Sequence, residues 1–474
     1  MTTYGTALGA TRTPIPGLVV FDLPVYGDSR GWFKENWQRA KMTALGLPDF
    51  GPVQNNISFN DAVGTTRGIH AEPWDKWVSV ATGRIFGAWV DLREGPSFGA
   101  IFTAEIDPSK AVYVPRGVGN SYQTLESDTA YTYLVNDHWS PDAAYSFLNL
   151  ADPTVAVPWP IALADAEVSE KDRGHPLLAD VTPLPPRKIL VLGSGGQLGR
   201  ALRAEFGDAG HVEYADRASL DVASADLSHA RRWREYSTII NAAAYTQVDL
   251  AETAEGRRDA WTINAHGVSA LARIATENAL TLVHVSSDYV FDGEADDAYG
   301  EDEPVSPLGV YGQSKAAGDH AAAATARHYI VRTSWVIGDG KNFVRTMASL
   351  AERGIDPRVV DDQRGRLTFT DDLARGIRLL LTEDAPFGTY NLTGGGGGST
   401  WADIARAVFQ ITGHDPARVT GVTTDEYFAG ATGPVAPRPK NSVLDLAKIS
   451  TLGYVAPDSG ARLAEYLRAA EPAS

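Results

Sequence analysis

The pattern of hydrophobic residues changes near residue 185, and this change constrains the fold more than any other feature of the sequence. Before it, short segments alternate between apolar and polar residues and are separated by Gly, Pro, Asn and Asp, at residues 77–81, 84–92, 100–106, 110–114 and 130–135. After Arg187, apolar strands alternate with helical segments. The first pattern predicts an antiparallel all-β sandwich or barrel. The second predicts an α/β fold built on a parallel sheet.

A proline-rich stretch separates the two patterns. Its last part, Pro183-Leu184-Pro185-Pro186, is typical of a semi-rigid linker. A chain of 474 residues is also longer than one hydrophobic core usually serves. We therefore expect a first domain over residues 1–182, a linker to about residue 186, and a second domain over residues 187–474.

Composition narrows the class of protein. The formal net charge of −17 argues against a general binder of nucleic acid or of an anionic membrane. The chain has no cysteine, which excludes disulfides, thiolate metal sites and cysteine nucleophiles. Residues 1–17 lack the apolar core of a signal peptide, and no run approaches the roughly 18 apolar residues of a membrane span. We expect a cytoplasmic protein that binds neither nucleic acid nor membrane.

A candidate catalytic group for ketone reduction lies in residues 283–315. An apolar strand at residues 281–285 is followed by two hydroxyl side chains, the second of which is Ser287. Tyr311 and Lys315 are four residues apart in an Ala-rich segment, 311–324, that is predicted to be a helix, so they share one helix face. A nearby ammonium lowers the pKa of a tyrosine. Together these groups could protonate a ketone oxygen as hydride reaches its carbon.

A glycine loop predicts a dinucleotide site at the start of the second domain. A buried strand at residues 188–192 runs into Gly193, Gly196 and Gly199, and a helix follows at residues 200–206. Glycine lets the backbone turn sharply and approach a pyrophosphate, and the helix N-terminus offers N–H groups to phosphate. In this context we assign Gln197 and Leu198, which lie between the second and third glycines, to the same cofactor site.

The end of the next strand, near residues 211–215, should bind the adenosine half of the cofactor. Asp216 would suit the ribose hydroxyls of NAD, whereas Arg217 would suit the 2′-phosphate of NADP, so NADPH and NADH both remain open. The pair Asp221 and Val222 could contact adenine. Residues 238–245 form another predicted strand, which runs into small residues, including Ala242 and Ala243, that would let the cofactor lie against the strand end.

These segments of the second half resemble the extended short-chain dehydrogenase/reductases, and within them the dTDP-4-dehydrorhamnose reductases. The resemblance also rests on residues 241–252, 332–335, 342–343, 362–365 and 437–439. It implies that Tyr311 is the proton donor, that Lys315 adjusts its pKa, and that Ser287 replaces the more usual Thr. It further implies substrate or nucleotide contacts for Val248, Tyr289, Trp335 and Asn342, a diphosphate clamp at Arg438, and a small C-terminal substrate domain beside a Rossmann-type doubly wound sheet.

The first half contains a cluster suited to acid–base chemistry next to a ketone. His70 is a suitable base near pH 7, and Lys76 or Arg67 could stabilise a developing enolate. Tyr133 could return a proton from the opposite face, and a carboxylate such as Asp152 could orient the imidazole. A barrel of this size can enclose one small ligand.

These residues resemble the dTDP-4-dehydrorhamnose 3,5-epimerases, which are cupin-like jelly rolls that work without metal. The resemblance covers about residues 13–165 and implies nucleotide contacts at Arg30, Phe33 and Glu35. Gln54 and Asn56 belong to a further matching segment and are assigned to substrate binding. One departure is Asn120, where the family usually has His. A metal cupin is disfavoured, because His70 has no histidine partner at short spacing.

Together the two halves predict a bifunctional enzyme of dTDP-L-rhamnose biosynthesis. The first would invert C3 and C5 of a dTDP-linked 4-keto-6-deoxyhexose, and the second would reduce the C4 ketone with NADPH or NADH. Three alternatives remain: epimerisation at one carbon only, a first half that is a non-catalytic binding or dimerisation module, and a nucleotide-sensing regulator. We expect no metal, and a homodimer formed through the cupin-like domain.

Overall fold

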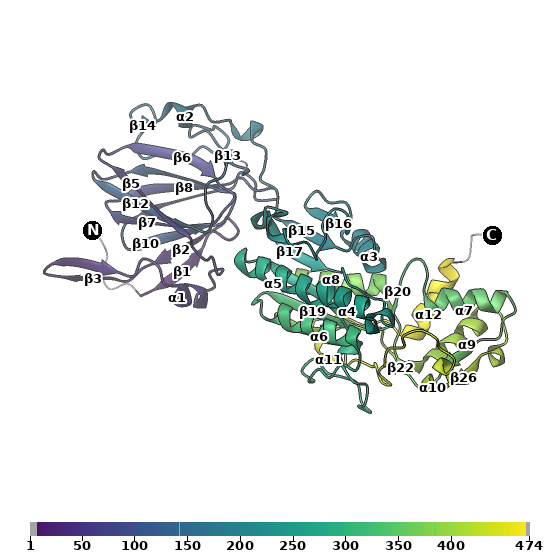
Figure 1. Ribbon diagram of the computed structural model, residues 1–474. Helices are drawn as coiled ribbons and strands as arrows, with labels where there is room; N and C mark the ends of the chain where they lie inside the picture. The colour runs from purple at the N-terminus through teal and green to yellow at the C-terminus, as the bar shows by residue number, and fades with distance from the viewer. Residues whose placement is uncertain (1–6, 142, 384, 471–474) are drawn as a thin grey trace. The chain divides into compact units, whose positions relative to one another are not determined.

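The computed structural model describes residues 7–141, 143–383 and 385–470, and the chain divides into two compact units between Pro186 and Arg187 (Figure 1). The first unit is made mostly of antiparallel strands, and the second of alternating strands and helices. No helix among the described residues is long and apolar enough to cross a membrane.

Two sheets form the first unit. One has the order β1-β2-β10-β7-β12-β5, and the other the order β13-β6-β11-β8-β9 with β14 parallel to β6. Their bounds are β1 Gly9–Arg12, β2 Val19–Asp22, β5 Gln54–Asn60, β6 Thr65–Ala71, β7 Lys76–Thr82, β8 Ile85–Asp91, β9 Ile101–Ile106, β10 Lys110–Val114, β11 Val118–Thr124, β12 Thr129–Val135, β13 Ser146–Phe147 and β14 Glu167–Val168. A hairpin of β3 Val25–Asp28 and β4 Gly31–Lys34 and the helices α1 Arg39–Ala44, α2 Glu170–Arg173 and η1 Leu178–Asp180 complete the unit.

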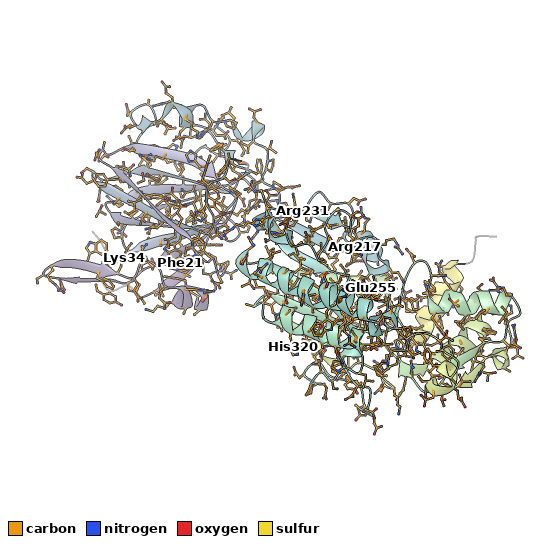
Figure 2. The ribbon with its side chains drawn as sticks, in the orientation of Figure 1. Phe21, Lys34, Arg217, Arg231, Glu255 and His320 are labelled. Carbon is orange, nitrogen blue, oxygen red and sulfur yellow. The ribbon has the colours of Figure 1, made fainter. Side chains whose placement is uncertain are left out.

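The alternation of side chains along β7 explains how this unit is packed. Val78 and Val80 are buried in the main core together with Trp89 of β8, because residues two apart share a face of a strand. Trp77 faces the other way and packs against Phe21, with ring centroids 4.9 Å apart. Phe21 is labelled in Figure 2. The period-2 pattern of the sequence therefore specifies which face of each strand is covered.

A six-stranded parallel sheet, β16-β15-β17-β18-β19-β24, is the centre of the second unit. The strand bounds are β15 Lys188–Leu192, β16 Val212–Ala215, β17 Tyr236–Asn241, β18 Thr281–Ser287, β19 His328–Thr333 and β24 Gly388–Asn391. The helices and turns are α3 Gln197–Phe206, η2 Leu227–His229, η3 Trp233–Glu235, η4 Leu250–Glu252, α4 Ala254–Trp261, the π-helical turn η5 Thr262–Gly267, α5 Val268–Glu277, η6 Asp288–Val290, α6 Val310–Ala323 and α8 Thr370–Thr382.

Helices cover both faces of this sheet (Figure 1). On one face Leu190 and Leu282 pack against Leu271 of α5. On the other face Val191 packs with Leu202 of α3 and with α8. The order of the strands reverses between β15 and β17, which is the point where ligands bind in open α/β sheets.

A smaller lobe on the C-terminal side of the chain has its own core. It contains α7 Phe343–Glu352, α9 Trp401–Ile411, η7 Pro416–Arg418, α10 Thr424–Phe428 and α12 Ser459–Ala470, while α11 Ala447–Ser450 lies near β24. The lobe also contains short strand pairs: β20 Val336–Ile337 with β23 Thr368–Phe369, β21 Arg358–Val360 with β26 Thr420–Val422, and β22 Arg364–Gly365 with β25 Ser399–Thr400.

Candidate active sites

The first unit contains a cavity of about 310 Å³ whose wall includes side chains from both sheets. His70 of β6 lines it from one sheet, and Tyr133 of β12 lines it from the other. Gln54 and Asn56 of β5, in the same sheet as Tyr133, also line it, and their side chains form a hydrogen bond of 2.8 Å. The remaining lining residues are Glu72, Trp74, Val135, Asp137, Trp139, Tyr145, Phe147 and Lys171. Such a mixture of aromatic and polar groups suits a small polar ligand with an apolar face.

The imidazole of His70 is held by Asp172. Its Nε2 lies 2.9 Å from Oδ1 of Asp172, and the His70 side chain is 34% exposed whereas Asp172 is buried. Burial opposes ionisation of Asp172, but its hydrogen bond and charge interaction with His70 hold the pKa below its usual value. The carboxylate is therefore charged near neutral pH, and it favours the tautomer in which Nε2 carries the proton.

Asp152 does not orient the imidazole, so this part of the sequence prediction is wrong. Its Oδ1 accepts hydrogen bonds from the backbone N–H groups of Thr154 and Val155, each at 2.9 Å, and its Oδ2 accepts one from Leu178 at 2.7 Å. The side chain is buried in a loop and completes the backbone hydrogen bonding there. Asp152 is thus a structural residue, and Asp172 takes the place predicted for it.

Lys76 lies beside Tyr133 at the buried side of the cavity. Its ammonium forms an ion pair with Glu72 and lies 5.6 Å from the centroid of the Tyr133 ring. Burial, followed by the charge of Glu72, raises the pKa of Tyr133, so the phenol keeps its proton. Three of the groups predicted for proton transfer, His70, Lys76 and Tyr133, therefore lie in or next to one cavity.

Arg67 is exposed and lies outside the set of lining residues. Its Nε donates to Oδ1 of Asn60 at 3.2 Å. Its charge still acts on Tyr133, where it opposes in part the rise in the pKa of that phenol. The assignment of Arg67 to the polar pocket therefore stays a prediction.

The predicted nucleotide contacts lie on or beside the β3–β4 hairpin, also outside the lining residues of the cavity. Arg30 pairs with Asp28, Glu35 pairs with Lys41, and the side chain of Phe33 is 66% exposed. Lys34, at the end of the same hairpin, donates to the carbonyl of Val80 at 3.0 Å, and burial lowers its pKa to about 8 (Figure 2).

Asn120 has a structural explanation. It is paired with His70 in the register of β11 and β6. Its Oδ1 accepts from Nε1 of Trp89 at 3.0 Å, and its Nδ2 donates to the hydroxyl of Tyr131 at 2.9 Å. A neutral amide satisfies both partners, one as acceptor and one as donor. A second imidazole does reach His70, but it comes from His175, whose ring centroid lies 5.3 Å away.

In the second unit, Ser287 ends β18 and Tyr311 lies in the first turn of α6. Burial, and then the charge of Asp288, raise the pKa of Tyr311 to about 12, while a hydrogen bond with Ser287 lowers it in part. The Ser287 hydroxyl also donates to Asp288 at 3.0 Å. The structure thus joins the serine and tyrosine that the sequence predicted, and it adds a buried carboxyl next to them.

Lys315 is buried on α6, and its Nζ donates to the carbonyl of Val285 at 2.6 Å. Burial lowers its pKa to about 8, and the charge of Asp319 opposes this shift. The expectation that Lys315 lowers the pKa of Tyr311 is wrong in this structure. Burial and Asp288 set the direction of the shift in the Tyr311 pKa, while the Lys315 ammonium donates to a strand carbonyl.

The glycine loop fits a dinucleotide for steric reasons. Gly193 has φ +74°, and a Cβ there would lie 2.7 Å from the backbone nitrogen of Ala243. A Cβ on Gly199 would lie 2.2 Å from the carbonyl oxygen of Gly193. Gly196 is the N-cap of α3, so the free N–H groups of that helix begin at Gln197. This arrangement gives phosphate a close approach to backbone donors.

Comparison with known proteins distinguishes the two halves. The sequence model of the RmlD substrate binding domain matches residues 187–471, and that of dTDP-4-dehydrorhamnose 3,5-epimerase matches residues 12–180. "Protein RmlC homolog" of Streptococcus pyogenes serotype M6 is 53% identical over 37% of this chain and 91% of its own length. The dTDP-4-dehydrorhamnose reductase of Aggregatibacter actinomycetemcomitans is 36% identical over 60% of this chain and 98% of its own length. The chain belongs to both families.

A solved structure agrees with this assignment. The dTDP-4-dehydrorhamnose reductase of Bacillus anthracis in complex with NADP is 30% identical, covers 60% of this chain and all of its own, and has a TM-score of 0.55. The chain is a bifunctional isomerase and NAD(P)H-dependent oxidoreductase of dTDP-L-rhamnose biosynthesis. The predicted families, fold class, activities and cofactor class are confirmed, and the three alternatives for the first half and the whole chain are not favoured.

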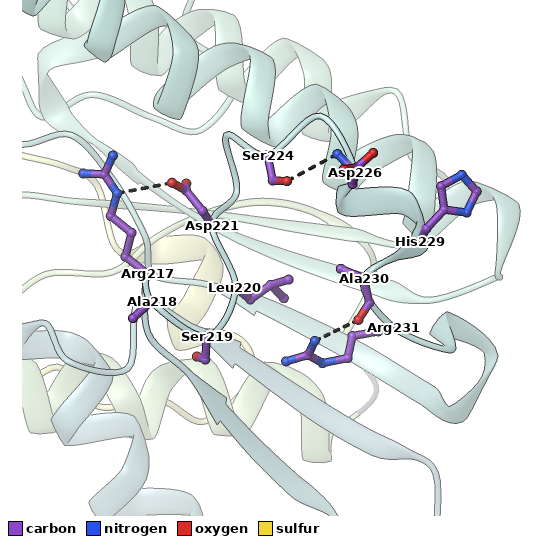
Figure 3. Close-up of a pocket in the computed structure, with 10 residues that line it drawn as sticks. All are labelled: Arg217, Ala218, Ser219, Leu220, Asp221, Ser224, Asp226, His229, Ala230 and Arg231. Atoms are coloured by element: carbon purple, nitrogen blue, oxygen red, sulfur yellow. Dashed lines mark hydrogen bonds and ion pairs between the residues drawn. The ribbon is translucent and has the colours of Figure 1, made fainter.

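In the reductase domain, a cavity of about 310 Å³ lies at the end of β16 (Figure 3). Arg217 and Asp221 line it and are joined at 3.3 Å. Asp216 precedes it, and its Oδ1 accepts hydrogen bonds from both the N–H and the hydroxyl of Ser219. These hydrogen bonds lower the pKa of Asp216. Val222 is buried against Gly267.

Arg438 lies opposite Asp249, the residue after Val248. Its Nη2 is 2.8 Å from both oxygens of Asp249, and the guanidinium lies 4.8 Å from the Phe428 ring. Tyr289 packs edge-on against Tyr311, with centroids 5.4 Å apart. Tyr289 therefore lies next to the Ser287–Tyr311 pair. Arg438 links the segment that contains Val248 and Asp249 to Phe428 of the C-terminal lobe.

Two other predicted substrate residues have structural contacts that account for them. Trp335, at φ +46°, stacks on Trp401 with centroids 3.8 Å apart and packs against the core of the small lobe. Asn342 is the N-cap of α7: its Oδ1 accepts from the N–H of Arg345, and its Nδ2 donates to Tyr466. The Asn342 amide is therefore occupied by the cap of α7 and by Tyr466 of α12, and we leave it out of the site.

Sequence reasoning missed Asp172, His175, Asp249 and Asp288. Asp172 lies 102 positions from its histidine, so no spacing rule links the pair. The segment Ser169-Glu170-Lys171-Asp172 carried one usable signal, because a serine three residues before an acidic residue marks a helix start, and Ser169 does cap α2. That signal predicts a helix but says nothing about what the helix approaches.

Proposed function

We propose that the epimerase domain, residues 1–182 with a linker to about 186, moves protons at C3 and C5 of a dTDP-linked 4-keto-6-deoxyhexose through His70, Lys76 and Tyr133. Nε2 of His70 donates to Asp172, so the lone pair on Nδ1 is free to take a proton from carbon. Lys76 stabilises the developing enolate. Tyr133, whose pKa is raised, returns a proton. The observation that carries this proposal is the His70–Asp172 pair at a cavity that Tyr133 lines from the other sheet.

We propose that the reductase domain, residues 187–474, then reduces the C4 ketone. The nicotinamide cofactor supplies hydride when it is bound. Its pyrophosphate and the adjacent ribose would be held by the glycine loop and the end of β17, that is by Gly193, Gly196, Gln197, Leu198, Gly199, Ala242 and Ala243. Ser287 holds the ketone oxygen by a hydrogen bond, and Tyr311 delivers a proton to it. The cofactor ribose and the substrate are oriented by Lys315, Val248, Tyr289 and Arg438. Burial raises the pKa of Tyr311, so this residue keeps its proton until hydride arrives.

Product analysis tests the two proposals together. The full chain, given dTDP-4-dehydro-6-deoxyglucose and NADPH, is expected to form dTDP-L-rhamnose, and NMR in deuterated solvent should show one deuteron at C3 and one at C5. Deuterium at one carbon only would contradict epimerisation at both positions. The same assay with the UDP-linked sugar measures how strongly the nucleotide is recognised.

Arg217 is proposed to bind the 2′-phosphate of NADPH. The Asp216 carboxylate is already engaged by Ser219, while the Arg217 guanidinium is largely exposed and pairs with Asp221. Arg217→Ala should raise KM for NADPH about tenfold, because one charge-assisted contact is worth about 1.5 kcal/mol. KM for NADH in the same variant should stay within about twofold, and equal increases for both cofactors would contradict the assignment.

We propose a homodimer formed through the epimerase domain. β5 is the edge of its sheet, and Ile57 and Phe59 on it are 68% and 56% exposed. An exposed apolar sheet edge favours pairing with another chain. A second chain would also offer a place for the Arg30, Phe33 and Glu35 segment and for Arg67 near a bound nucleotide.

Substitution of both edge side chains tests the dimer. Ile57→Lys with Phe59→Lys is expected to convert a dimer into a monomer in light scattering coupled to size exclusion, because two buried charges at a shared edge are costly. The matched control is Val455→Lys, which changes an 85% exposed apolar residue in the reductase domain. A monomeric wild-type chain, or a dimer that survives both edge substitutions, would contradict the proposal.

We further propose that the enzyme works in the cytoplasm and does not bind nucleic acid. Support comes from the absence of cysteine and from the net charge of −17. Cell fractionation with an antibody to the chain, and a gel-shift assay with duplex DNA at low salt, test the two statements.

A further inference from the structure

His175 is a buried histidine that the proposed epimerase mechanism does not use. Its side chain is 7% exposed, and the ring interacts with the backbone of Leu148 on one side. The ring stacks on Phe147, with centroids 4.9 Å apart, and its Nε2 lies 3.7 Å from Oδ1 of Asp172. The ring of His175 thus lies buried beside both a carboxylate and the imidazole of His70, whose ring centroid is 5.3 Å away.

We infer that His70, Asp172 and His175 form a binding site for Zn²⁺ and that the bound ion inhibits the epimerase. Their ligand atoms all lie within 4.8 Å of one another. Ligands about 2.0–2.1 Å from a tetrahedral zinc ion are about 3.3 Å apart. The Asp172 oxygen lies 2.9 Å from His70 Nε2 and 3.7 Å from His175 Nε2, and these distances bracket that value.

The chemistry of these ligands fits zinc. Two imidazoles and one carboxylate are a ligand set that zinc accepts, with a fourth position left for water. A carboxylate oxygen such as that of Asp172 binds zinc in its ionised form. His70 also lines the cavity, so an ion can enter from there.

Zinc at this position removes the base. Nε2 of His70 gives its lone pair to the ion in place of its hydrogen bond to Asp172, and the single proton of the neutral ring moves to Nδ1. The Nδ1–H group has no lone pair left to take a proton from C3 or C5. This step involves no oxidation or reduction, and chelation of the ion reverses it. The inference rests on the proposed role of His70 as the base.

The test compares zinc sensitivity in the full chain with that of His175→Phe, which keeps the stacking on Phe147 but has no ligand nitrogen, and of His175→Ala. Solvent-deuterium exchange at C3 and C5 is measured in buffered free Zn²⁺, and each protein is referred to its own zinc-free rate. We expect at least tenfold inhibition of the wild type, restored by EDTA. The two variants should need at least tenfold more zinc.

Two controls separate this site from adventitious binding. His138→Ala removes an exposed histidine of the same domain and should leave zinc sensitivity unchanged. NADPH oxidation with an already epimerised substrate should be insensitive to the same zinc concentrations. Calorimetry should give one zinc ion per chain for wild type and none of that affinity for His175→Phe.

Three outcomes would overturn the inference: equal zinc sensitivity in wild type and both His175 variants, no inhibition of exchange at millimolar zinc, or inhibition of the reductase in parallel. Exchange by His70→Ala without zinc is measured separately. Retained exchange in that variant would refute the proposed base, whereas lost exchange with any of the three outcomes would refute only the zinc site.

Discussion

Replacing Tyr311 by Phe is expected to lower the rate of NADPH oxidation by about 10²- to 10⁴-fold, the usual contribution of a positioned general acid. The substitution removes only the hydroxyl, and the ring keeps its edge-on contact with Tyr289. Because burial holds the pKa of Tyr311 at about 12, the phenol is protonated throughout the working range and is available as a donor. The loss should therefore appear in kcat and not be rescued by raising or lowering pH between about 6 and 9.

The same variant should still exchange deuterium at C3 and C5, because its epimerase domain is unchanged. Tyr289→Phe is the matched control: it removes a neighbouring phenol that we assign to binding, and its loss of kcat should stay below about tenfold. Loss of both reduction and exchange in Tyr311→Phe would show that the two activities are not divided between the domains as proposed.

His70→Ala is expected to lower solvent exchange at C3 and C5 by about 10²- to 10⁴-fold, since it removes the base that takes the proton from carbon. Reduction of an already epimerised substrate by the same protein should continue at the wild-type rate. Proton NMR in deuterated buffer measures the first activity, and NADPH absorbance measures the second. Exchange that persists at one carbon would mean that a different group serves that position.

Asp172→Asn and Asp152→Asn separate the two carboxylates that could serve His70. Asp172→Asn should slow exchange strongly, because an amide stabilises the imidazolium less well than a carboxylate. Asp152→Asn should instead lower stability by about 1–3 kcal/mol, through its three backbone hydrogen bonds, with exchange per folded molecule little changed. The opposite pattern would restore the original prediction for Asp152.

Local sequence patterns predicted the elements well. The strand at residues 188–192 coincides with β15, and the predicted helix at 311–324 corresponds to α6 Val310–Ala323. α3 begins at Gln197, three residues before the expected 200, because Gly196 adopts an extended N-cap conformation and the helix starts immediately after it. Hydrophobic period and glycine position are local properties, so they can be determined without knowledge of the fold.

Residues that act within one segment were also predicted from the sequence. Tyr311 and Lys315 are on one helix, and Ser287 ends a strand at the edge where ligands of such sheets bind. The prediction was wrong where a residue's partner comes from a distant segment. Asp172 replaced Asp152, and Lys315 turned its ammonium to the Val285 carbonyl and not to Tyr311.

The sequence alone determined that one half of the chain forms antiparallel strands and the other a parallel sheet with a glycine loop, because side-chain period and backbone freedom depend on neighbouring residues. It also supplied the histidine, lysine and tyrosines that the two chemistries need. Only the tertiary structure decided which carboxylate serves His70 and that His175 lies beside its ring, because Asp172 and His175 are both more than 100 residues from His70 along the chain. The distance between side chains so far apart in the sequence is set by the folding of the chain, and no rule of residue spacing predicts it.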